Sequence, residues 1–241
     1  MENLPWIIIL IFGGQTLGSF VGLVKNPSKM ILHGSLAFAA SMMILISLFQ
    51  LIPEGLKSAP LYLVTLSFFA GIGAMWPIDK LVPHINPELG KKERPSVKRS
   101  VTMLVIGIAL HNLPEGLAIG IGFALEPKLG ITIALAIAVQ DVPENIATIV
   151  PLYGITKKKV KSFVITTGTI LFELIGFIIG YFALRDLSSD VLGASLALAG
   201  GFMVYISVEE LIPSAQIKKY PLTGAISMLL GAICVGLTSL I

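Results

Sequence analysis

Eight long apolar runs constrain what this chain can fold into more than any other feature of its sequence. They cover residues 6–24, 32–53, 61–78, 100–125, 129–153, 162–184, 191–212 and 222–241. Each run is close to the roughly 20 apolar residues that a helix needs to cross the hydrocarbon core of a bilayer. Hydrophobic residues make up 55% of the 241 positions and charged residues only 13%, so little chain is left for a soluble domain. We therefore predict a single domain over residues 1–241, an all-α integral membrane protein with eight transmembrane helices.

The connectors between these runs predict the orientation in the membrane. They are short except for residues 82–98, whose prolines, glycine and basic residues predict a flexible loop. Of the 17 lysines and arginines, 14 lie on the same side as this loop, and only Lys57, Lys128 and Arg185 lie on the other. The positive-inside rule makes the first side cytoplasmic. We expect a multi-pass protein of the cell membrane with both termini extracytoplasmic, and no nucleic-acid partner, because the positive charge follows the topology.

Five ionisable residues lie near the middle of spans, where hydropathy does not explain them: His111, Glu115, Asp141, Glu144 and Glu173. Four carboxylates at mid-bilayer cost on the order of 10 kcal/mol on insertion scales. No lysine or arginine shares their depth in the sequence. The compensating charge must therefore come from protons or from a bound cation.

Helical spacing and ligand chemistry favour a metal. The candidate ligands are His111, Asn112, Glu115, Gln140, Asp141, Glu144 and Glu173. Ligands that lie three or four residues apart on one helix share a face of that helix, so they can point at the same ion. One imidazole, four carboxylates and two amides suit zinc, iron or manganese, and the presence of a single cysteine argues against copper(I). The number of ligands exceeds one tetrahedral shell, which predicts two adjacent metal positions bridged by Glu144.

Two prolines fall inside the same helical turns as these ligands. Pro114 and Pro143 lack an N–H group, and so free the carbonyl groups of Leu110 and Val139. Such broken backbone bonds are tolerated in a membrane where the helix is buried in protein or lines a wet cavity. We predict a helix kink at each proline.

Glu209 and Glu210 lie near the cytoplasmic end of the seventh span and are candidates for a metal exit site. A solvated acidic pair near Lys218 and Lys219 is an equally good interpretation of the same residues. Two sequence echoes link helices of opposite direction: residues 111–118 match 140–147 in polarity, and Leu-Ile-Pro occurs at 51–53 and again at 211–213. Inverted repeats of this kind are a recurring plan of secondary transporters.

The motifs HNLPEG in the fourth span, QDVPEN in the fifth, a lone glutamate in the sixth and EELIP in the seventh resemble the ZIP (Zrt/Irt-like protein) family of divalent metal transporters, in its bacterial, GufA-like form. The resemblance implies inverted repeats of the first three and last three spans around the fourth and fifth, and uptake of zinc toward the cytoplasm through a binuclear site. One position would use His111, Glu115, Gln140 and Glu144, and the other Asn112, Asp141, Glu144 and Glu173. Gln140 and Asp141 stand where many members have a histidine motif, so iron, manganese and cadmium remain open as substrates.

The sequence contains no nucleotide-binding fingerprint, so we expect a secondary transporter driven by an ion gradient or the membrane potential, and not an enzyme. We expect no prosthetic group; the partners are divalent metal ions and the lipid bilayer, and a homodimer remains open. Two alternatives stay open. One is an intramembrane metallohydrolase, although the chain has no HExxH motif, and the other is a proton or monovalent-cation carrier.

Overall fold

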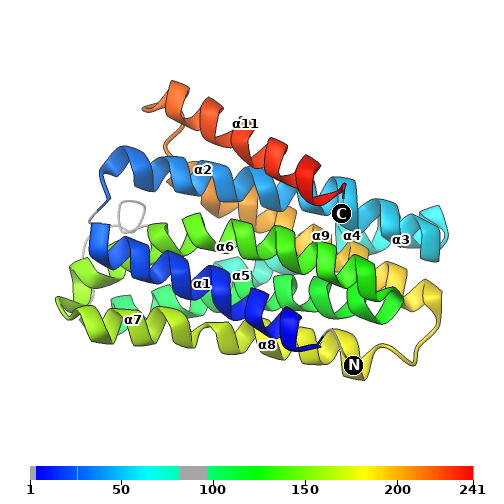
Figure 1. Ribbon diagram of the computed structural model, residues 1–241. Coiled ribbons are helices and arrows are strands. Elements are labelled where there is room, and N and C mark those ends of the chain that lie inside the picture. The colour runs from blue at the N-terminus through cyan, green and yellow to red at the C-terminus, as the bar shows by residue number, and fades with distance from the viewer. Residues whose placement is uncertain (1–3, 26, 82–96, 241) are drawn as a thin grey trace.

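The computed structural model describes residues 4–25, 27–81 and 97–240 (Figure 1). These residues are almost entirely helical and contain no strand. Within them, eight helices or groups of consecutive helices are long and apolar enough to cross a membrane. The predicted all-α fold with eight spans is therefore confirmed. The predicted flexible loop, 82–98, lies almost wholly outside the described residues.

Five spans are single helices: α1 (Leu4–Lys25), α4 (Leu61–Leu81), α5 (Val97–Leu125), α6 (Pro127–Thr156) and α11 (Pro221–Thr238). The second span consists of α2 (Lys29–Ile46), the π-helix η1 (Ser47–Leu51) and α3 (Ile52–Ser58). The sixth consists of α7 (Lys159–Gly168), α8 (Ile170–Ile178) and η2 (Ile179–Ala183). The seventh consists of α9 (Ser189–Ile206), η3 (Ser207–Leu211) and α10 (Ile212–Ser214). Most limits lie within a few residues of the predicted ones.

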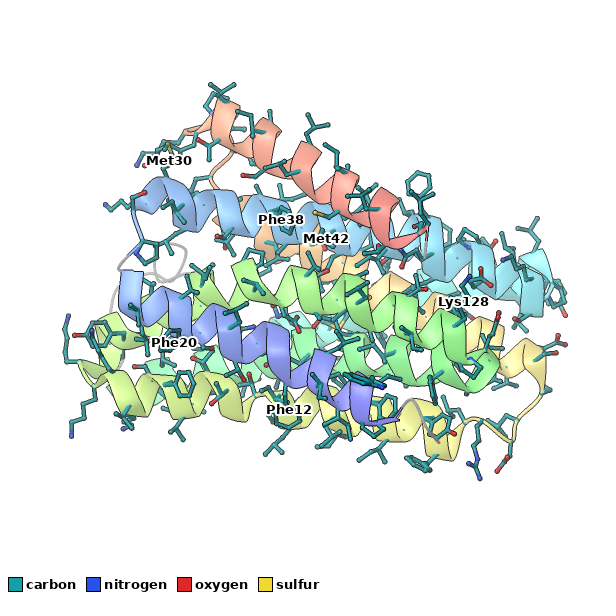
Figure 2. The ribbon with its side chains drawn as sticks, in the orientation of Figure 1. Phe12, Phe20, Met30, Phe38, Met42 and Lys128 are labelled. Carbon is teal, nitrogen blue, oxygen red and sulfur yellow. The ribbon has the colours of Figure 1, made fainter. Side chains whose placement is uncertain are left out.

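The helices run lengthwise through one bundle, and α1 begins at the same end of it at which α11 finishes (Figure 1). Helices α5 and α6 pack against each other, α1 lies along α6, and α8 lies along α5. Outside them, α4 packs on α9 and α11 on α2. Large apolar side chains such as Phe20 point away from the bundle (Figure 2). Such exposure is expected where the surrounding solvent is lipid.

Contacts in one half of the bundle recur in the other. Gly18 of α1 lies against the Val142 carbonyl oxygen of α6, and Gly176 of α8 lies against the Leu113 carbonyl oxygen of α5. A Cβ atom at either glycine would overlap the facing backbone, so only glycine permits this approach. Val142 and Leu113 hold the same place in the two proline-centred motifs. Such paired contacts are expected of an inverted repeat, which itself stays a prediction.

The echo between the second and seventh spans is longer in the structure than the three residues noted in the sequence. Both η1 and η3 are π-helical and begin at a serine whose hydroxyl donates to the carbonyl group four residues earlier. The Ser47 bond to Met43 measures 2.7 Å, and the Ser207 bond to Met203 measures 2.8 Å. Back-bonding of this kind competes with the helix ladder, and single π turns often mark functional sites.

The sixth span is not the continuous helix that its apolar run predicts. It breaks at Thr169, the last residue of a run of threonines and a glycine at 166–169. The Thr169 hydroxyl donates to the Thr166 carbonyl oxygen at 2.6 Å, so it competes with the helical backbone bonds at this turn. The break lies one turn before Glu173.

Candidate metal centre

Three carboxylates from α5 and α6 converge in the middle of the bundle. Glu115, Asp141 and Glu144 each offer one oxygen atom, and these three atoms all lie within 4.8 Å of one another. All three side chains are buried. Every lysine and arginine side chain that the structure describes is exposed, so none of these can neutralise the cluster. Only a cation or protons can make such a group of acids tolerable at this depth.

The polar atoms left without a hydrogen bond identify the kind of partner that is required. Five of them, on the described side chains, are His111 Nε2, Glu115 Oε2, Gln140 Oε1, Asp141 Oδ2 and Glu173 Oε1. Each atom can present a lone pair, as a metal ligand must. Buried polar atoms in folded proteins almost always have partners. Five unpaired atoms of ligand type on the predicted metal-binding residues therefore fit a cation.

His111 is oriented by its own helix. Its Nδ1 atom lies 2.8 Å from the Gly107 carbonyl oxygen, an acceptor only, so Nδ1 carries the proton and donates it. Nε2 then has a free lone pair, as in metal-binding histidines held by a backbone carbonyl group. This Nε2 faces Glu210, whose Oε2 atom is 3.6 Å away.

Gln140 ties the two central helices together. Its side-chain amide donates to the Glu115 carboxylate on α5, and at 3.4 Å to Glu144 on its own helix. With the amide nitrogen used in this way, the Gln140 carbonyl oxygen is the atom left unpaired. Gln140 therefore holds two acids in place and still offers an oxygen ligand.

A second group of buried polar residues joins α1, α5 and the broken sixth span. Asn112 donates to the Thr169 carbonyl oxygen at 3.1 Å and to Gln15 Oε1 at 3.3 Å. Gln15 in turn donates to Glu173 Oε2. Gln15 is not among the predicted site residues, although a glutamine inside an apolar span is a signal of the same kind as the intramembrane acids.

The predicted site residues thus fall into two connected groups. Glu115, Asp141 and Glu144 are the closest together. Gln140 donates to Glu115 and Glu144, and His111 lines the same cavity as Glu144. Asn112 and Glu173 are joined through Gln15. How these residues divide between one or two metal positions stays a prediction.

The predicted exit pair separates into two different environments. Glu210 is half-buried and faces His111, whereas Glu209 is exposed. Helices α5 and α6 continue through Pro114 and Pro143, so the ligands on either side of each proline remain on one helix. A kink at these prolines stays a prediction.

A cavity of about 520 Å³ connects the site with one end of the bundle. Its inner wall includes His111, Glu144 and Glu210, and its outer wall includes residues from the start of α2 and the end of α6. At its mouth, His33 bonds through Nδ1 to the Ser214 carbonyl oxygen at 3.1 Å and stacks on Tyr220, which gives this histidine a structural role. This is the end of the bundle from which the basic connectors leave.

Known proteins resemble this chain over most of its length. The family model described as ZIP zinc transporter matches residues 87–239, which include all of α5 to α11. Proteins named zinc transporter ZupT from Salmonella newport (strain SL254), Salmonella typhimurium and Salmonella typhi are each 33% identical to it over 224 residues. The alignment covers 89% of this chain and 87% of each relative.

Proposed function

This chain belongs to the ZIP family of zinc transporters, and from that premise we propose that it is a secondary transporter that moves zinc and related divalent ions into the cytoplasm. The observation that carries the proposal is the convergence of Glu115, Asp141 and Glu144, together with the unpaired ligand atoms on these and the other predicted site residues. Such a site needs a cation. Its place inside a bundle that can span the membrane suits a cation that is transported. The family's function makes an enzymatic role unnecessary to explain the site.

The ligand set favours two adjacent metal positions. His111 and Glu144 line the cavity, and Gln140 donates to both Glu144 and Glu115. Asn112 and Glu173 belong to the group held by Gln15. Glu144 carries two oxygen atoms and can serve both positions. A mixture of one nitrogen and several oxygen donors accepts zinc, iron, manganese and cadmium, so we propose a broad divalent substrate range.

The cavity suggests the direction of release. It leads from His111 and Glu144 past Glu210 to the end of the bundle that carries most of the basic residues. The positive-inside rule makes this end cytoplasmic, so this conformation would be open to the inside. A divalent ion that moves inward through 100 mV gains about 4.6 kcal/mol, twice the roughly 2.3 kcal/mol per elementary charge. Uptake would therefore need no ATP and no other coupling.

The test is metal flux through the purified protein in liposomes. With a zinc-sensitive dye inside and a potential that is negative inside, we expect zinc uptake by the wild type, loss of uptake in Glu144→Gln, and retention in Glu209→Gln. The second variant is a matched control because it makes the same chemical change on an exposed side chain. Tight metal binding without any flux would overturn the transport proposal in favour of a metal enzyme or sensor. Sodium or potassium flux equal to that of zinc would favour the monovalent-cation carrier.

A further inference from the structure

Gln15 is the residue that α1 contributes to the second group of buried polar residues, which also contains Asn112, Thr169 and Glu173. Its side chain is completely buried, and α1 otherwise meets the central helices mainly through small and apolar residues. Gly14, directly before it, lies against the Ala138 carbonyl oxygen and the Asp141 Cβ atom of α6. A side chain on residue 14 would overlap this backbone, so glycine is what allows α1 to approach the site closely.

Both ends of the Gln15 amide are used. Its nitrogen donates to Glu173 Oε2, and its oxygen accepts from Asn112 Nδ2 at 3.3 Å. A carboxylate at this position could accept but not donate, and a lysine could donate but not accept. Glutamine therefore matches both partners without adding charge to a cluster that already has a surplus of acids.

The consequence for Glu173 is that one of its two carboxylate oxygens is fixed and the other is free. Oε2 accepts from Gln15, whereas Oε1 is buried and has no hydrogen bond. This arrangement makes Glu173 a single-oxygen ligand with a set orientation. Partners of this kind, which hold a ligand from behind, typically change metal affinity by about 10- to 100-fold when they are removed.

Asn112 is oriented in the same way. Its amide nitrogen is directed at Gln15 and at the Thr169 carbonyl oxygen. The Thr169 carbonyl belongs to the break in the sixth span, so the break supplies one of the two acceptors. Neither bond uses Asn112 Oδ1, which is therefore the atom that this side chain can offer as a ligand.

We propose that Gln15 is a positioning residue of the metal site: from α1 it fixes Glu173 and Asn112 so that each offers one oxygen atom to the same cation. The proposal rests on the proposed function, because it needs a divalent cation as the object that these oxygens face. It also gives α1 a role in metal affinity, since a displacement of α1 from α8 would release Glu173.

The experiment measures equilibrium binding of zinc to the purified protein in detergent by calorimetry, with flux in liposomes as a separate readout. Gln15→Met keeps the length and flexibility of the side chain while it removes both hydrogen-bonding groups. We expect a loss of about 10- to 100-fold in the affinity of at least one zinc ion. The matched control is Ser19→Ala, a buried residue one turn further along α1 whose hydroxyl has no hydrogen bond, and it should bind zinc as the wild type does.

A double-variant comparison separates positioning from a general structural effect. If Gln15 acts mainly through Glu173, then Gln15→Met should cause little further loss of affinity in a Glu173→Ala background. Equal losses in both backgrounds, or wild-type affinity in Gln15→Met, would overturn the proposal. Liposomes that take up no zinc with the wild-type protein would overturn the proposed function instead, while the binding data would still decide the role of Gln15.

Discussion

The first three and the last three spans carry similar packing positions but different polar groups. Gln15 of α1 and Glu173 of α8 each lie three residues before a glycine that packs on a central helix. Gln50 of η1 and Glu210 of η3 hold the same place in the two π-helical segments. In both pairs, the residue from the first three spans is an amide and the residue from the last three spans is an acid.

Gln50 and Glu210 also have different surroundings, whereas Gln15 and Glu173 bond to each other. Gln50 donates to Ser239 at 3.1 Å and more weakly to Thr238, both at the end of α11. Glu210 lines the cavity and faces His111. Each amide therefore joins neighbouring helices, Gln50 to the end of α11 and Gln15 to α5 and α8, whereas Glu210 faces the proposed metal path. Two halves with similar packing positions can in this way give a pathway with two different ends.

The largest expected effect is at the centre, where the two halves meet. Glu115→Gln keeps the shape of a ligand and removes one of three clustered charges, so we expect zinc affinity to fall by at least about 100-fold. The metal-free protein should become more stable, by about 1 to 4 kcal/mol, because a buried negative charge that no described cationic side chain balances has been removed. Thermal unfolding with and without zinc measures both effects. Lower stability of the metal-free variant would show that the acids hold the bundle together without metal.

The paired glycines test whether the two halves are equivalent in packing. Gly18→Ala and Gly176→Ala each place a methyl group against the backbone of a central helix. Overpacking of this kind costs about 1 to 3 kcal/mol, and the two losses in the free energy of unfolding should be similar. Gly13→Ala is the control, since a Cβ there meets no neighbouring atom. A large difference between Gly18→Ala and Gly176→Ala would argue against an inverted repeat.

Much of this architecture could be predicted from the sequence because the bilayer makes hydropathy decisive. The eight apolar runs gave the eight spans, and the spacing of Glu115, Asp141 and Glu144 gave a convergence that the structure contains. A helix that must satisfy its own backbone in lipid leaves few alternatives. Residues on its inner face are then fixed by the 3.6-residue period.

The parts that were missed depend on local competition and on contacts between distant segments. The break at Thr169 arises because a threonine hydroxyl competes for a backbone carbonyl group, which an apolar run conceals. The role of Gln15 depends on Asn112 and Glu173, 97 and 158 residues away in the chain. Glu209 and Glu210 could not be told apart because adjacent residues on a helix face different directions, and the sequence alone did not give the direction of the cavity.

Gln50 and Glu210, the matched positions of the two π-helical segments, can be tested one at a time. Glu210→Gln makes the seventh span resemble the second, and we expect zinc flux to fall about tenfold, a change of about 1.4 kcal/mol, with little change in stability. Gln50→Met removes hydrogen bonds to α11, so we expect a loss of about 1 kcal/mol of stability and little change in release on the cavity side. Zinc flux into liposomes and thermal unfolding, measured for both variants, test these two expectations. Loss of stability in Glu210→Gln with unchanged flux would mean that both positions are structural.

The smallest effect we predict is that of pH, and it tests whether the buried acids serve metal or protons. A metal must displace protons from carboxylates and needs the neutral form of His111, so acid pH should slow zinc flux by a fewfold per unit as the ligands become protonated. The sign follows from competition: protons and zinc occupy the same lone pairs, and raising the concentration of one lowers the occupancy of the other. Flux measured with equal pH on both sides of the liposome removes any contribution from a proton gradient.

In Glu210→Gln, which lacks the acid that faces His111, the flux that remains should keep this pH dependence if the central ligands cause it. A flux that rises steadily as the pH falls would instead assign the acids to proton transfer, and the amide-for-acid difference between the halves would then mark a proton path.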